Sequence, residues 1–172
     1  GYFGGSYLKD YNPKSKRPLD SKKALHLVLR SSRATGAQSF KNKNYEAKIW
    51  DIISRHASRT GIKIHQYANG GNHLHLLIRA KHREDYCAFI RIITGLIARL
   101  VANAERGAPL HKRFWDGRPF TRLVSYAKKE YQVVRAYLLR NVLEAIGWIS
   151  YTPRSVRLPD ELRMIFKSSS YS

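Results

Sequence analysis

The sequence IKIHQYANGGNHLHLLIRA, residues 62–80, contains two short apolar segments on either side of the turn-forming triplet NGG at 69–71. An Asn-Gly pair between such segments is a strong signal for a β-hairpin. Because side chains alternate between the two faces of a strand, His73 and His75 are predicted to share one face, with leucines on the other. The hairpin therefore places two imidazoles side by side.

Further strands and helices are predicted on both sides of this hairpin from the spacing of apolar residues. We expect strands at 24–30, 62–68, 72–80 and 120–125, and helices at 43–59, 83–103 and 128–146. The order strand, helix, strand, strand, helix, strand, helix is typical of α+β folds. We predict a ferredoxin-like sandwich, with a mostly antiparallel sheet of about four or five strands and helices on one face.

The length of 172 residues favours a single domain with a substantial core. We expect a basic N-terminal arm at 1–23, a folded domain at 24–147 and a basic C-terminal appendage at 148–172, with a short helix around 160–166. The single cysteine, Cys87, excludes an internal disulfide and a thiolate zinc cluster. The start of the sequence shows no secretory signal, so a cytoplasmic location is expected.

The balance of charge is the most unusual bulk property. The chain has 32 Lys and Arg against 12 Asp and Glu, which gives a formal net charge of +20. Such a charge favours a polyanionic partner. No apolar stretch approaches the roughly 20 residues that span a bilayer, so nucleic acid is preferred to a membrane as partner.

The His73 and His75 pair is a candidate metal site. Neutral imidazole is a common metal ligand, and two imidazoles at i and i+2 on a strand can hold one ion while leaving other positions open. A strand with two surface or structural histidines remains the alternative. No carboxylate occurs between Asp51 and Glu84, so a phosphate group would meet little repulsion at this hairpin.

The segment YLLRN in the last predicted helix adds a phenol and an amide. Tyr137 and Asn141 are four residues apart, so they project from the same helical face. Taken singly, Tyr137 suits a boundary aromatic and Asn141 a helix-surface residue. Together with a strand His-x-His in a basic protein, they form a much narrower pattern.

These features resemble the HUH-type single-tyrosine (Y1-like) transposases, and within them the REP-associated and insertion-sequence group. The resemblance covers residues 24–147 and rests on four segments of the sequence: NGGNHLHLLIRA, FIRIITGLIARL, FWDGRPFTRLVS and YLLRNVLEAIG. One departure is that many REP-associated relatives have Pro after the Asn, where this chain has Val142.

The resemblance implies a function, a cofactor and roles for individual residues. His73, His75 and Asn141 would bind Mg²⁺ or Mn²⁺, and Tyr137 would attack a DNA phosphorus, forming a 5′-phosphotyrosine and releasing a 3′-hydroxyl. The implied substrate is single-stranded DNA beside a hairpin, in the cytoplasm and associated with the bacterial nucleoid. Either a monomer or a homodimer is compatible with the sequence.

Basic and aromatic residues are candidates for holding this DNA. Cations can bind phosphates and make affinity fall with salt, and aromatic rings can stack on unpaired bases. The alternatives are a solvated basic face and a loop that packs onto the core. The DNA-binding candidates are Arg79, Lys81, Arg83, Phe114, Trp115, Arg118 and Arg122, with Phe120 as a further stacking surface.

Other polar residues give weaker signals. His26 and His65 are candidates for supporting the metal site or contacting DNA, although a lone strand histidine is more often structural. The remaining lesser candidates are the tyrosines Tyr86, Tyr126 and Tyr131 and the glutamates Glu130 and Glu144.

Two competing functions have similar sequence features. A non-catalytic or domesticated module that binds structured nucleic acid would have the same charge and fold, but would form no protein–DNA adduct. A replication initiator or conjugative relaxase would use related chemistry, commonly in a larger chain or with a different order of motifs.

Overall fold

The computed structural model describes residues 2–3, 19–103, 113–124, 128–145 and 149–150. Its elements are β1 (Tyr2–Phe3), β2 (Ala24–Arg30), a 3₁₀ turn (Gly36–Gln38), α1 (Glu46–Arg59), β3 (Lys63–Asn69), β4 (His73–Arg79), α2 (Arg83–Ala102), β5 (Phe120–Val124) and α3 (Lys128–Ala145). Every strand and helix predicted between residues 24 and 147 is present, with small shifts at the ends. The helix predicted at 160–166 lies outside the described residues.

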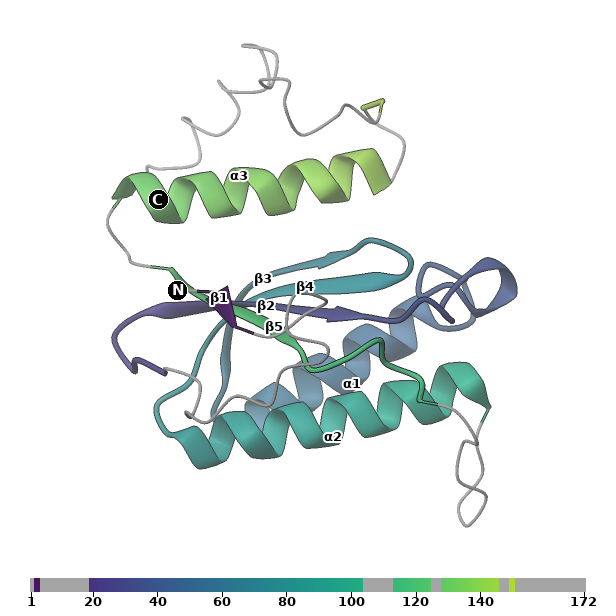
Figure 1. The fold of residues 1–172 in the computed structure, drawn as a ribbon, viewed down its shortest axis with the longest axis horizontal. Coiled ribbons are helices and arrows are strands. Elements are labelled where there is room, and N and C mark those ends of the chain that lie inside the picture. Colours follow the sequence, from purple (N-terminus) through teal and green to yellow (C-terminus); the bar gives the residue numbers. More distant parts are fainter. Residues whose placement is uncertain (1, 4–18, 104–112, 125–127, 146–148, 151–172) are drawn as a thin grey trace.

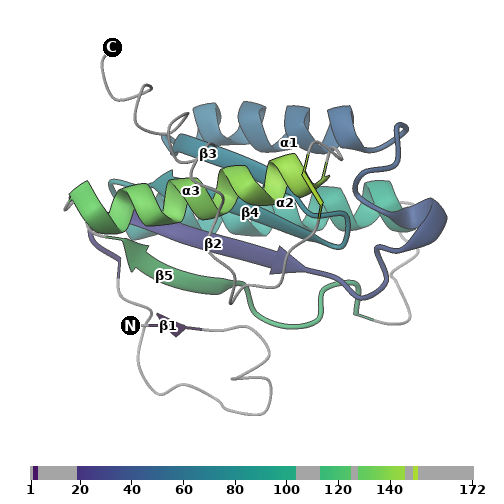
Figure 2. The same ribbon diagram turned by 90° about the horizontal axis from the view of Figure 1, so that it is seen from above.

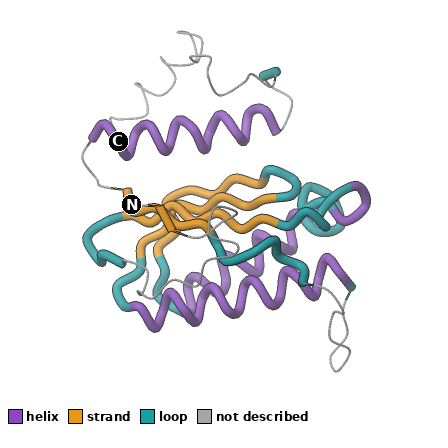
Figure 3. The backbone as a smooth tube through the Cα atoms, viewed as in Figure 1, coloured by secondary structure: helices purple, strands orange, loops and turns teal. Residues whose placement is uncertain are grey.

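The described strands form one five-stranded antiparallel sheet in the order β1-β5-β2-β4-β3 (Figure 3). Without β1, this is the strand order of a ferredoxin-like sheet built from the sequence β-α-β-β-α-β. The predicted α+β fold class is therefore confirmed. The edge strand β1 was not predicted: Tyr2 and Phe3, which belong to the predicted arm, pair with Arg122 and Thr121 of β5.

The helices lie on both faces of the sheet rather than on one (Figures 1 and 2). Helices α1 and α2 cover one face, as expected, whereas α3 crosses the opposite face. The reason is that α1 and α2 already cover the leucine-rich face, while α3 packs on a separate apolar cluster. That cluster contains Ala24, Leu77, Val124, Val134 and Leu138.

The main core lies between the sheet and the helices α1 and α2. Leu27 and Leu76 from the central strands meet Ile53 of α1 and Phe89 and Ile93 of α2, and all five side chains are fully buried. Burying a side chain of this size contributes roughly 1.5–3 kcal/mol. No helix in the part of the chain that the structure describes is long and apolar enough to cross a membrane.

The register between β2 and β4 decides which residues face α3. Leu27 pairs with Leu76, and the next positions pair Val28 with His75 and Arg30 with His73. Directly paired residues of antiparallel strands share a face, so the leucines enter the main core while both histidines lie on the α3 side. The predicted alternation of the histidine strand is thereby confirmed.

Leu76→Ala tests the position of the core beneath the histidine strand. Leu76 is fully buried, so we expect its truncation to lower the free energy of unfolding by about 2–5 kcal/mol. The matched control is Val133→Ala on α3, where the side chain is 63% exposed and the change should be within about 0.5 kcal/mol. Denaturant unfolding measures both values, and equal effects would contradict the described packing.

Candidate functional site

His73 and His75 lie next to each other on β4, beneath α3. Their ring centroids are 4.8 Å apart and their planes are nearly perpendicular, at 85°. His75 is buried, with 4% of its surface exposed, and His73 is partly exposed. The central strand thus holds two imidazoles at the boundary between sheet and helix.

A third histidine from β2 joins this pair. His26 Nε2 lies 3.1 Å from His75 Nδ1, and the two rings are nearly parallel, at 13°. Burial, and then the positive charge of Arg122, lower the pKa of His26 to about 4. His26 is therefore neutral at pH 7, and one proton lies between the two facing nitrogens.

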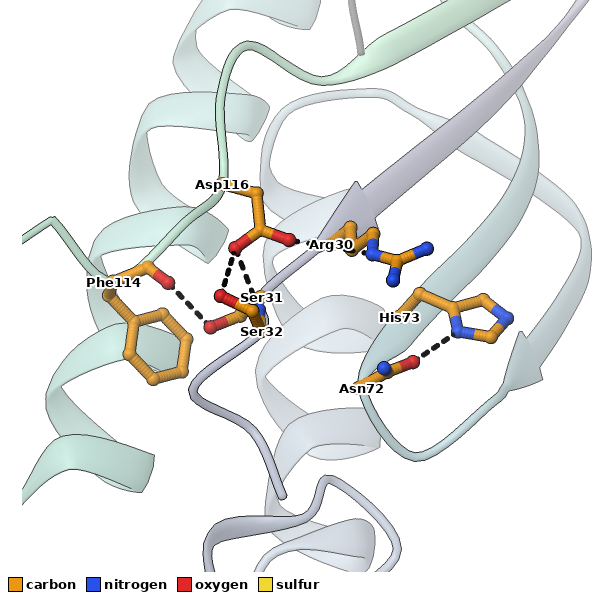
Figure 4. A network of polar contacts seen from close by, with 7 residues as sticks. All are labelled: Arg30, Ser31, Ser32, Asn72, His73, Phe114 and Asp116. Atoms are coloured by element: carbon orange, nitrogen blue, oxygen red, sulfur yellow. Dashed lines mark hydrogen bonds and ion pairs between the residues drawn. The ribbon is translucent and has the colours of Figure 1, made fainter. Parts of the chain in front are cut away.

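The orientation of His73 is set by its neighbours in the hairpin. Its Nδ1 donates to Asn72 Oδ1 at 2.7 Å (Figure 4), because a carbonyl oxygen can only accept. Nε2 of the neutral ring then carries the lone pair. The ring also packs closely on the turn: a Cβ atom added at Gly70 would lie 2.3 Å from Cε1 and Nε2 of His73.

Helix α3 brings the predicted tyrosine to the histidines. The ring of Tyr137 is 5.8 Å from that of His75 and 6.4 Å from that of His26, edge-on to both. The adjacent Leu138 packs with Leu77 in the small apolar cluster, which fixes the helix over this part of the sheet.

Asn141 lies one turn further along α3. Helix α3 and strand β4 run in opposite directions (Figure 2), so the backbone of α3 continues from Leu138, which packs with Leu77, toward the end of the sheet where β4 begins at His73. Its Nδ2 atom is buried and has no hydrogen-bond partner among the described residues. A buried N–H donor without a partner is costly, and such a donor suits an acceptor such as a phosphate oxygen rather than a metal cation.

The donor set fits a divalent ion with open coordination positions. The described residues contain no cluster of three His, Cys, Asp or Glu that could hold a metal, and the amide oxygen of Asn141 is the third ligand that the resemblance to the transposase family implies. Nδ1 of His75 faces His26, and Nδ1 of His73 binds Asn72, so Nε2 is the remaining nitrogen of each ring; in His73 this atom packs against Gly70. Imidazole nitrogens suit Mn²⁺ better than Mg²⁺, which prefers oxygen ligands.

An ion pair lies on the same side of α3. Arg140 Nε and Glu144 Oε1 are 2.9 Å apart, and their side chains are only 12% and 13% exposed. Glu144, a lesser candidate from the sequence, therefore has its charge balanced by Arg140. The sequence analysis missed Arg140, although its spacing of three residues from Tyr137 is a signal for a shared helical face.

The predicted DNA-binding residues do not form one group. Arg122 of β5 pairs with His26 and lies on the α3 face, where Phe120 is also in edge contact with the His26 ring at 6.2 Å. The remaining cations lie elsewhere: Arg79 ends β4 at the end away from His73, Lys81 and Arg83 follow it, and Arg118 lies exposed in the loop before β5.

The two aromatic residues of that loop pack onto the protein. Phe114 is 4% exposed and contacts Phe40, so its ring face is covered, which does not favour the base-stacking role expected for it. Trp115 donates Nε1–H to the carbonyl oxygen of Thr94 at 3.0 Å. Both side chains therefore fit the alternative given in the sequence analysis, in which this loop packs onto the core.

A polar network fastens the same loop to the end of β2 (Figure 4). Asp116 Oδ1 accepts from the backbone and hydroxyl of Ser32 at 2.7 and 2.8 Å, and Oδ2 lies 3.4 Å from Arg30 Nε. The Ser31 hydroxyl donates to the Phe114 carbonyl. Since Arg30 pairs with His73, the loop is anchored close to the histidine end of β4.

The remaining lesser candidates lie away from the histidines or outside the description. Tyr86 is buried in the main core. His65 is half-buried at a β-bulge in β3, where burial and the charges of Lys63 and Arg79 lower its pKa. Tyr126 and the side chains of Glu130 and Tyr131 lie outside the described residues.

Comparison with known proteins gives one family match. The family described as "Transposase IS200 like" matches residues 21–141. None of the curated proteins matches the chain. A crystal structure of a "putative transposase" from Deinococcus radiodurans is similar in fold, with a TM-score of 0.47 and 17% identity over 75% of this chain and 98% of that one.

Gly70→Ala tests the contact that orients His73. The added methyl group would clash with the imidazole, so we expect the ring to rotate away and its side-chain NMR signals to shift. Gly95→Ala in α2 is the matched control, because its Cβ meets no atom within 4 Å. Unchanged His73 signals in folded Gly70→Ala would contradict the contact.

Proposed function

Because this chain belongs to the IS200-like transposase family, whose members are DNA-cleaving enzymes, we propose that it cuts and rejoins single-stranded DNA through a covalent 5′-phosphotyrosine at Tyr137. The observation that carries the proposal is the position of the Tyr137 ring, 5.8 Å from the ring of His75 on the neighbouring strand.

In the proposed reaction the Tyr137 oxygen attacks the scissile phosphorus. The Oη–P bond forms as the bond to the 3′-oxygen breaks; the phenol gives its proton to solvent, and the departing 3′-oxygen takes up a proton from solvent and becomes the 3′-hydroxyl. The phosphotyrosine conserves the bond energy, so a second 3′-hydroxyl can reverse the step and rejoin DNA. No hydrolytic water is needed.

His73, His75 and Asn141 would hold the divalent ion, for which we propose Mg²⁺ or Mn²⁺. When bound, the ion would polarise the phosphate and stabilise charge on the leaving oxygen. The rigid strand would keep the two Nε2 atoms in place, and Asn141 would contribute its amide oxygen from the helix. The buried Nδ2 of Asn141 is a hydrogen-bond donor without a partner among the described residues, and a phosphate oxygen of the DNA would accept from it.

The charge and the face under α3 support single-stranded DNA as substrate. A net charge of +20 attracts a polyanion, and Arg122 places one cation beside the histidines. A duplex would hold its phosphates at a fixed distance from this helix-covered site, whereas a single strand can bend into it. We propose a hairpin next to the cleavage point as the recognition element, with stacking on Phe120 as a contribution.

Tyr137→Phe tests the nucleophile. A single-stranded oligonucleotide carrying a hairpin and a 3′ label should form a labelled adduct with the wild-type protein on a denaturing gel, because the label stays on the 5′-phosphotyrosine fragment. Loss of the phenol oxygen should lower adduct formation by about 10³-fold or more.

Tyr67→Phe is the matched control for this change. The Tyr67 hydroxyl is buried and has no hydrogen-bond partner in the part of the chain that the structure describes, and its ring packs against the main core, so loss of the hydroxyl should leave the adduct unchanged. Full adduct formation by Tyr137→Phe would exclude Tyr137 as the nucleophile. Tight hairpin binding by a wild-type protein that forms no adduct would favour a non-catalytic binding module.

His73→Ala tests the metal site. Removing one imidazole should weaken Mn²⁺ binding by about 100-fold or more, since even an outer partner of a ligand typically contributes 10–100-fold. Mn²⁺ titration followed by electron paramagnetic resonance measures the affinity without DNA or turnover. The control is His82→Ala, whose side chain is exposed before α2; an equal affinity in both variants would exclude His73 as a ligand.

A further inference from the structure

His26 is the buried histidine for which the proposed reaction has no role. It lies on β2 opposite Leu77, two residue pairs along from the pairing of Val28 with His75 and therefore on the same face of the sheet. This diagonal position brings its Nε2 within 3.1 Å of His75 Nδ1. The rings of Phe120 and Tyr137 contact it edge-on at 6.2 and 6.4 Å, and only 8% of the residue is exposed.

The contact allows two arrangements of the shared proton. In the first, His75 Nδ1 donates to His26 Nε2, and the lone pair of His75 is on Nε2. In the second, His26 Nε2 donates to His75 Nδ1, and the neutral His75 ring then carries its own proton on Nε2. Only the first arrangement leaves His75 able to bind a metal through the atom that does not face His26.

We propose that His26 is a positioning residue, which accepts the Nδ1 proton of His75 and thereby fixes both the tautomer and the plane of that imidazole. This inference rests on the proposed function, because the consequence of the fixed tautomer is a metal-binding Nε2. A hydrogen bond from the other ring nitrogen to an acceptor is the usual way in which a ligating histidine is oriented, and here the acceptor is a second imidazole.

The surroundings of His26 explain why this acceptor is a stable one. Two aromatic edges hold the ring in place, and the surrounding burial keeps water from competing for the His75 proton. A side chain that places a hydrogen-bond acceptor at the same distance from the backbone should be able to take over the role of His26. Glutamine places its amide oxygen close to the position of the imidazole Nε2, whereas leucine fills similar space and offers no acceptor.

Imidazole NMR of the metal-free protein tests the proton arrangement directly. Long-range ¹H–¹⁵N spectra distinguish the two tautomers of His75. We expect the Nδ1–H form in the wild type and in His26→Gln, and a mixture of tautomers in His26→Leu. An Nε2–H form in the wild type would overturn the proposal, and so would an unchanged Nδ1–H form in folded His26→Leu. The wild-type spectrum shows which nitrogen of His75 carries the proton, even where the leucine variant does not fold.

Mn²⁺ titration of the same variants tests the consequence for binding. His26→Leu should weaken Mn²⁺ binding by about 10–100-fold, and His26→Gln should restore it close to the wild-type value. Equal weakening by both variants would show that only the packing of His26 matters, and would overturn the proposal. If the wild type has the Nδ1–H tautomer but binds no Mn²⁺, the proposed metal chemistry fails while the control of His75 by His26 stands.

Discussion

The pairing of β2 with β4 is the constraint on which the site depends. It places Leu27 opposite Leu76 on the core face, and His26 and His75 on the other. A slip of one residue in either strand would turn its leucines outward and its histidines into the main core, which would cost many kcal/mol of buried apolar area. The same apolar packing that stabilises the fold therefore fixes which atoms of the three histidines meet.

The chemistry is divided between two layers that are held with different strength. The histidines lie on central strands above a large core, whereas α3 is fastened by a small cluster through Val134 and Leu138. Elements with few buried apolar contacts open at a lower free energy than the core. The proposed nucleophile is thus carried by the part that can open at lower free energy, while the imidazoles stay fixed, which would suit the admission and release of the proposed DNA substrate.

The local periodicity of the sequence was enough to predict the helices and strands and which of their residues share a face. It could not predict contacts between segments that are distant in the sequence. The strand at 24–30, the shared face of His73 and His75, and the spacing of Tyr137 and Asn141 all follow from periods of two and about four residues. The contact of His26 with His75 joins residues 49 apart, and it depends on a strand register that periodicity does not encode. The two-residue strand β1 is too short for any pattern, and the side of the sheet that α3 covers depends on what α1 and α2 already bury.

The charges around the site link the two partners of the proposed reaction. The proposed ligands, two imidazoles and one amide, are neutral, and Arg122 adds a positive charge beside His26, so the protein alone would compensate little of the charge of a divalent ion. The carboxylate of Glu144 is already balanced by Arg140. A DNA phosphate would supply the missing negative charge and would itself be attracted by the ion and by the basic surface. By linkage, each partner would then raise the affinity for the other by the same factor, so we expect the proposed site to bind an ion most tightly with DNA in place.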